Sequence, residues 1–179
     1  MKQQKILFIG GPGTGKSTLI NFLEKKGHCC LHEISREITL AAQKKGIDQL
    51  FLTEPLLFSE LLLKGRIEQF QKAGNSTKKI VFIDRGIPDV TTYLDYSNLD
   101  YPDFFSEANK KFRYDKIFLL PIWKEIYSSD NERYETYEEA LKIQEHLTKT
   151  YKDLGYELIL VPKTNIEKRA EFVLQHLNG

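Results

Sequence analysis

The sequence lacks the features that mark several common classes of protein. Its 26 lysine and arginine residues against 25 aspartate and glutamate residues leave a formal net charge of +1, so the basic excess typical of nucleic-acid-binding proteins is missing. No apolar run reaches the length of about 18 residues that a membrane-spanning helix needs. The apolar run at residues 6–9 is also too short for the core of a secretion signal. We therefore expect a cytoplasmic protein that binds no nucleic acid and has no membrane span.

Cysteine is scarce, and repeats and linkers are missing. The two cysteines, Cys29 and Cys30, are adjacent, and neighbouring residues reach disulfide geometry only with strain. We expect them to be small buried residues of a strand rather than redox or metal-binding groups. A chain of 179 residues without an internal linker predicts a single domain over residues 1–179. We expect it to be a monomer or a homodimer.

Short apolar runs alternate with longer segments of helical periodicity along the whole chain. This alternation predicts a parallel sheet with helices on both faces, in which ligands bind beyond the carboxyl ends of the strands. The predicted strands cover residues 5–9, 28–32, 79–83, 116–120 and 156–161. The predicted helices cover residues 16–26, 34–45, 55–74, 87–95, 103–112, 136–154 and 164–177.

The most specific motif is a glycine-rich loop. Residues 10–17 read GGPGTGKS and fit the pattern G-x-x-x-x-G-K-[ST] between a buried strand and a helix, a context that an ordinary glycine-rich turn does not require. Glycines let backbone N–H groups surround a phosphate, and the helix N-terminus attracts its charge. Lys16 would reach the β- and γ-phosphates, and Ser17 would coordinate Mg²⁺. The predicted nucleotide-binding residues here are Gly10, Gly11, Pro12, Gly13, Thr14, Gly15, Lys16, Ser17 and Thr18.

Acidic residues follow two of the predicted strands. Asp84 directly follows the strand at 79–83, where it would hold Mg²⁺ through water or, alternatively, cap the next helix. Glu33 follows the strand at 28–32, where it would hold or deprotonate an acceptor hydroxyl or, alternatively, cap the next helix. Arg85 would contact phosphate or the acceptor, or form a solvated ion pair. Arg36, three residues after Glu33, would bind an anionic acceptor.

Two further segments are candidates for the nucleotide site. Residues 123–136 are rich in charge and include Arg133. Such a segment would close as a lid, with Arg133 stabilising charge on the transferring phosphoryl group, unless it is a solvated loop. Residues 161–165 follow the last strand. There Pro162 and Thr164 would lie near the base, unless this is an ordinary connection between a strand and a helix.

Together these motifs resemble the P-loop nucleoside and nucleotide kinases. The likeness is greatest to a small AAA-domain ATPase-like family that is similar to the ribosylnicotinamide kinase domain of bifunctional NMN adenylyltransferases, and it spans about residues 5–177. The resemblance implies a three-layer α/β/α P-loop NTPase fold, with a five-stranded parallel sheet in the order 2-3-1-4-5 and a small lid. It further implies ATP, or GTP in its place, with Mg²⁺, and it makes Glu33 the acceptor-side acid and Asp84 the magnesium-side acid.

We therefore predict a kinase that transfers the γ-phosphoryl group of ATP to a small metabolite, such as a nucleoside or nucleotide. Its catalytic residues would be Lys16, Glu33, Asp84 and Arg133. The alternative is a hydrolytic switch that uses ATP or GTP and binds a protein partner. Two related classes are disfavoured. A ring-forming AAA+ machine would place Glu after Asp84, where this chain has Arg85, and a signalling GTPase would contain Asn-Lys-x-Asp, which is absent.

Overall fold

The computed structural model describes residues 3–127 and 135–177. Its centre is a sheet of five parallel strands in the order β2-β3-β1-β4-β5. The strands are β1 (Gln4–Ile9), β2 (Cys29–Leu31), β3 (Ile80–Asp84), β4 (Lys116–Leu119) and β5 (Leu158–Leu160). The predicted fold class and strand order are confirmed.

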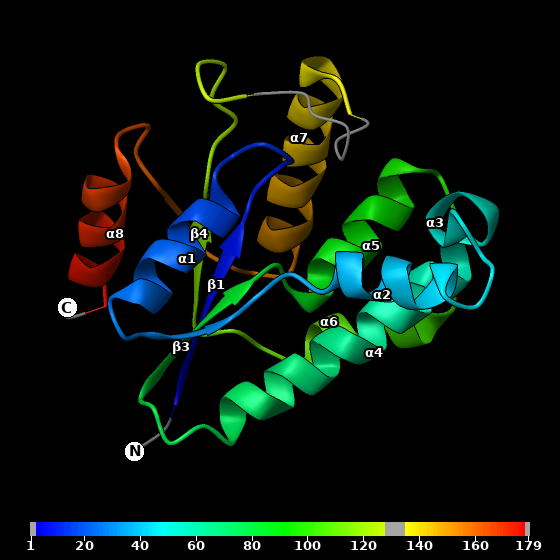
Figure 1. The fold of residues 1–179 in the computed structure, drawn as a ribbon, viewed down its shortest axis with the longest axis horizontal. Coiled ribbons are helices and arrows are strands. Elements are labelled where there is room, and N and C mark those ends of the chain that lie inside the picture. The colour runs from blue at the N-terminus through cyan, green and yellow to red at the C-terminus, as the bar shows by residue number, and fades with distance from the viewer. Residues whose placement is uncertain (1–2, 128–134, 178–179) are drawn as a thin grey trace.

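Helices cover both faces of the sheet. Figure 1 shows α1 and α8 on one side of the strands and α4, α5 and α7 on the other. Two apolar clusters fill the space between sheet and helices, one beneath α1 and α8 and one beneath α7 and the end of α4. A third cluster joins α4, α5 and α6. The helices are α1 (Lys16–Lys25), α2 (Ser35–Gln43), α3 (Leu50–Thr53), α4 (Pro55–Gly74), α5 (Ile87–Tyr96), α6 (Asp103–Lys111), α7 (Tyr137–Asp153) and α8 (Ile166–Gln175).

The strand β1 lies at the middle of the sheet, and this position places the functional loop. Its residues 6–9 are fully buried, as expected for an apolar run that is covered by helices on both faces. Phe8 is paired with Asp84 of β3 on one side and with Phe118 of β4 on the other. The loop after β1 therefore begins beside the carboxyl ends of both neighbouring strands.

The structure refines several sequence-based boundaries. Asp84 is the last residue of β3 rather than the first residue after it. The four-residue helix α3 was not predicted, because one turn is too short to show a helical period. Cys29 and Cys30 lie on the edge strand β2 and are half-buried free thiols, so the expectation of full burial is wrong.

The predicted lid is described only at its two ends. Residues 128–134, including Arg133, lie outside the described residues. At the described ends, the Tyr127 hydroxyl donates to the Glu135 carbonyl at 2.5 Å. Across the part of the chain that the structure describes, no helix combines the length and the apolar character needed to span a bilayer.

Candidate active site

The glycine-rich loop joins β1 to α1 in a conformation that depends on its glycines. Gly13 and Gly15 have φ values of 74° and 82°, which glycine adopts without the steric cost that other residues incur. A Cβ atom on Gly11 would lie 2.8 Å from Ile122 Cδ1 and 2.9 Å from the Ala140 carbonyl oxygen. The loop is therefore packed closely against the segment after β4 and the start of α7.

Lys16 is folded over this loop. Its Nζ donates to the carbonyls of Gly10 and Gly11 at 2.9 Å each and to the Thr14 hydroxyl at 3.2 Å. Burial, together with the charge of Arg85, lowers the pKa of Lys16 to about 7, although Asp84 opposes the change. No carboxylate among the described residues forms an ion pair with it. The ammonium group is thus held by neutral oxygens, and a phosphate oxygen is a stronger acceptor than these.

Ser17 and Asp84 face each other at the end of the loop. The Ser17 hydroxyl lies 3.5 Å from Asp84 Oδ2. Asp84 is 2% exposed, and its Oδ1 has no hydrogen-bond partner in the described part of the chain. Burial raises the pKa of Asp84, although Lys16 and Arg85 oppose the change. An unsatisfied buried carboxylate oxygen beside a hydroxyl fits Mg²⁺, which prefers hard oxygen ligands.

A magnesium ion at this position would need further ligands from outside the protein. Within residues 3–127 and 135–177, no group of three His, Cys, Asp or Glu side chains is arranged to hold a metal ion. Mg²⁺ is commonly bound by one or two protein oxygens together with water and substrate phosphates. Ser17 and Asp84 match that pattern.

Glu33 lies at the centre of a second group of charged residues. Its Oε2 is 2.5 Å from Arg85 Nε, and its Oε1 is 3.4 Å from Arg66 Nη2. The backbone N–H groups of Ile34 and Ser35 also donate to Oε1, at 2.9 Å each. Burial alone would raise the pKa of Glu33, but the two guanidiniums and the two N–H groups hold it at about 2. The carboxylate therefore stays ionised at neutral pH.

The same group includes Asp89, which is completely buried on α5. Asp89 Oδ2 accepts from the Gly86 N–H at 3.0 Å and from the Tyr151 hydroxyl at 2.5 Å. Arg66 donates to the Gly86 carbonyl at 2.9 Å. Because Glu33 and Asp89 balance Arg66 and Arg85, this set is electrically neutral; we refer to these four residues as the acceptor-side cluster.

Arg85 has an unusual backbone conformation that its neighbours stabilise. Its φ of 66° is rare for a residue with a side chain. Its Nη1 donates to the Tyr93 hydroxyl at 3.0 Å and lies 4.0 Å from Asp89 Oδ1. The guanidinium is also 5.6 Å from the centre of the Tyr93 ring. These contacts direct the Arg85 side chain toward Glu33. Two of the three residues predicted to contact the acceptor therefore lie together.

Four further predicted residues lie on α1, on α2 and after β5. Arg36 is exposed in the first turn of α2, and Thr18 is exposed on α1. Pro162 is exposed and Thr164 half-buried in the connection between β5 and α8. None of these four is brought into the hydrogen-bonded groups described above.

Sequence reasoning missed three buried charged residues: Arg66 on α4, Asp89 on α5 and Arg169 on α8. Arg169 Nη2 donates to the Thr14 carbonyl at 3.0 Å, although 155 positions separate the two residues. Arg66 and Arg169 lie at positions where the helical period places apolar residues. That mismatch is a sequence signal that could have identified both.

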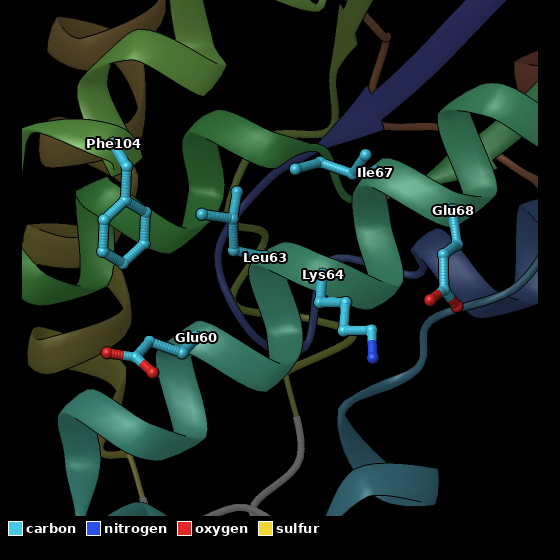
Figure 2. A pocket seen from close by; sticks show the side chains of 6 residues that line it. All are labelled: Glu60, Leu63, Lys64, Ile67, Glu68 and Phe104. Carbon is cyan, nitrogen blue, oxygen red and sulfur yellow. The ribbon is translucent and has the colours of Figure 1, made fainter.

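Two surface pockets lie along α4, away from the glycine-rich loop. One, of about 350 Å³, is formed mainly by α4 with Phe104 of α6 facing it (Figure 2). The other, of about 510 Å³, is lined by the start of α4 and residues 99–100. None of the predicted site residues lines either pocket, so neither marks the chemistry inferred from the sequence.

Comparison with known proteins agrees with the observed fold. The family model described as an AAA domain matches residues 5–169. The chain belongs to this family. A comparison with curated protein sequences gave no match.

Solved structures show the same fold at low sequence identity. Deoxyadenosine kinase from M. mycoides, with dCMP and dCDP bound, superposes with a TM-score of 0.74 at 18% identity, covering 98% of this chain and 99% of that one. Thymidylate kinase from Candida albicans gives 0.72 at 17% identity, covering 99% and 92%. The NadR protein in complex with NR gives 0.76 at 20% identity, covering 98% of this chain and 51% of NadR. The AAA-domain chain thus shares its fold with P-loop kinases.

Proposed function

We propose that this protein is a kinase that transfers the γ-phosphoryl group of ATP, with Mg²⁺, to a hydroxyl or phosphate group of a nucleoside or nucleotide. The observation that supports this most is the ion pair of Glu33 with Arg85, the residue directly after Asp84, because Asp84 faces Ser17 and both charges of the pair act on the pKa of Lys16. A phosphate-binding loop alone fits any P-loop protein. A separate polar cluster next to it fits an acceptor.

On the donor side, Lys16 would exchange its carbonyl acceptors for phosphate oxygens. This exchange raises the Lys16 pKa, because an anion replaces neutral partners around a buried ammonium group. Ser17 and Asp84 would hold Mg²⁺, which when bound neutralises charge on the phosphates. Asp84 gains a partner for its unsatisfied Oδ1.

On the acceptor side, Glu33 would accept a hydrogen bond from the acceptor hydroxyl and orient it toward the γ-phosphorus. A carboxylate with a pKa of about 2 is a weak base, but the loose transition state of phosphoryl transfer needs little base strength. The hydroxyl oxygen forms the new P–O bond while the bond to the ADP oxygen breaks. Glu33 then receives the proton, once the new bond has made that oxygen strongly acidic. Arg85 keeps the carboxylate in place.

Three further roles complete the proposal. Arg133 would close over the nucleotide and stabilise charge on the phosphoryl group. Pro162 and Thr164 would lie against the base, and Arg36 would meet an anionic acceptor. The fold shared with deoxyadenosine kinase, thymidylate kinase and NadR supports a nucleoside or nucleotide as the acceptor.

The proposal is tested by incubating the protein with Mg·ATP and a metabolite extract, followed by separate panels of nucleosides and nucleoside monophosphates. Mass spectrometry should detect a phosphorylated product that is missing with Lys16→Ala. Lys25→Ala, at an exposed position on the same helix, should form the product normally. Release of ADP without any phosphorylated product would contradict a kinase and favour a hydrolytic switch.

A further inference from the structure

Arg169 differs from Arg66 and Arg85 in having no acidic partner among the described residues. Arg66 and Arg169 are each 4% exposed, and Arg66 faces Glu33 at 3.4 Å. Arg85, at 17% side-chain exposure, is 2.5 Å from the same carboxylate. Among the described residues no carboxylate forms an ion pair with Arg169. Burying an arginine without a carboxylate is costly unless another anion compensates the charge.

The contacts that Arg169 does make are with the glycine-rich loop. Its Nη2 donates to the Thr14 carbonyl at 3.0 Å, and a Cβ atom on Gly15 would lie 2.8 Å from its Nη1. Its Nε is buried and has no partner in the described residues. The helix α8 therefore places a guanidinium directly against the outer side of the loop at the Thr14–Gly15 peptide.

The contact of Arg169 with the Thr14 carbonyl also sets the direction of the Gly15 N–H. In a trans peptide the C=O and the following N–H point in opposite directions, and no described peptide bond is cis. Because Arg169 holds the Thr14 carbonyl toward α8, the Gly15 N–H points away from α8. A charged donor on the carbonyl also polarises the peptide, which makes this N–H a stronger donor.

We propose that Arg169 is a positioning residue for the polyphosphate of the nucleotide. Arg169 fixes the direction of the Gly15 N–H. The bound polyphosphate in turn supplies a negative charge that compensates the buried guanidinium of Arg169. A side chain at position 15 would displace this guanidinium, in addition to the backbone strain that the φ of 82° would impose on it. The inference rests on the nucleotide-binding part of the proposed function and does not depend on phosphoryl transfer.

The test measures the affinity of the purified protein for ADP and for inorganic tripolyphosphate by calorimetry. Arg169→Met should weaken both by the same factor, about tenfold or more, because a unit positive charge that faces the phosphate-binding loop is lost. Arg169→Lys should recover part of the loss, since it keeps the charge. Lys168→Met, which changes an exposed lysine of the same helix, should bind both ligands as the unaltered protein does.

Three outcomes would overturn the proposal. The first is unchanged affinity for both ligands in Arg169→Met, with the thermal midpoint of the ligand-free protein lowered, which would make Arg169 purely structural. The second is a loss for ADP but not for tripolyphosphate, which would assign the guanidinium to the base or ribose. If Arg169→Met does not fold, the affinities of Arg169→Lys for ADP and tripolyphosphate decide. The third contradicting outcome is that Arg169→Lys binds these ligands no better than Lys16→Ala does. A protein that binds both ligands but phosphorylates nothing would defeat the kinase proposal and leave this one standing.

Discussion

The two halves of the candidate site differ in how their charges are compensated. On the phosphate-loop side, Lys16 and Arg169 donate only to neutral oxygens, and Asp84 forms no ion pair among the described residues. In the acceptor-side cluster, two guanidiniums face two carboxylates. A half with uncompensated charges gains most from a ligand that brings both an anion and a cation, as Mg·ATP does. A neutral half selects its ligand by hydrogen bonding and shape.

The largest effect should come from the phosphate-loop side. Lys16→Ala removes the cation nearest the transferred group, so phosphoryl transfer should fall by about a thousandfold. The rate of product formation at saturating acceptor measures it, with Lys25→Ala as the matched control. A residual rate within tenfold of the unaltered protein would show that Lys16 does not contact the reacting phosphate.

On the other half, Glu33→Gln should separate turnover from nucleotide binding. The amide keeps the shape but loses the charge that orients the hydroxyl, so kcat should fall by about a hundredfold while the affinity for ATP stays near normal. Steady-state kinetics measures kcat, and calorimetry measures the affinity for ATP. Glu37→Gln, at an exposed position on α2, is the control. An equal loss of ATP affinity would place Glu33 on the donor side and break the comparison.

The acceptor-side cluster should also make stability depend on pH. The pKa of Glu33 in the folded state is about 2, below its ordinary value of 4.5. Glu33 therefore stabilises the fold fully above pH 4.5, and this contribution is lost as the pH falls toward 2. The shift corresponds to about 2–3 kcal/mol after allowance for its partial exposure. Urea unfolding at several pH values should show that the free energy of unfolding of the unaltered protein rises between about pH 2 and pH 4.5. If the free energy of unfolding of Glu33→Gln changes with pH as steeply as that of the unaltered protein, the ion pairs of Glu33 with Arg66 and Arg85 do not form.

A smaller effect is expected at Asp84. Asp84→Asn removes a magnesium ligand, so the Mg²⁺ concentration for half-maximal activity should rise about tenfold. The ligand-free protein should lose no stability, because an unpaired buried carboxylate is replaced by a neutral group. Magnesium titration and thermal unfolding test both statements, with exposed Asp48→Asn as control. Unchanged magnesium dependence would remove Asp84 from the metal site.

Local patterns in the sequence were sufficient for the phosphate-loop residues and the parallel strands, and the family resemblance supplied the strand order. Neither predicted the partners of the charged groups. The loop was predictable because residues 10–17 are contiguous and flanked by a strand and a helix. Glu33 and Asp84 were predictable because each follows or ends a short apolar run. The contacts of Arg66 with Glu33 and of Arg169 with Thr14 join distant segments. Only packing of α4 and α8 brings them together.

The most direct test of this comparison is amide hydrogen exchange with and without Mg·ATP. We predict slower exchange at residues 10–17, because backbone N–H groups of this loop would donate to the phosphates of the nucleotide. We predict no change at Ile34 and Ser35, whose N–H groups already donate to Glu33. Protection at Ile34 and Ser35, with none at residues 10–17, would contradict the assignment of the nucleotide to the glycine-rich loop.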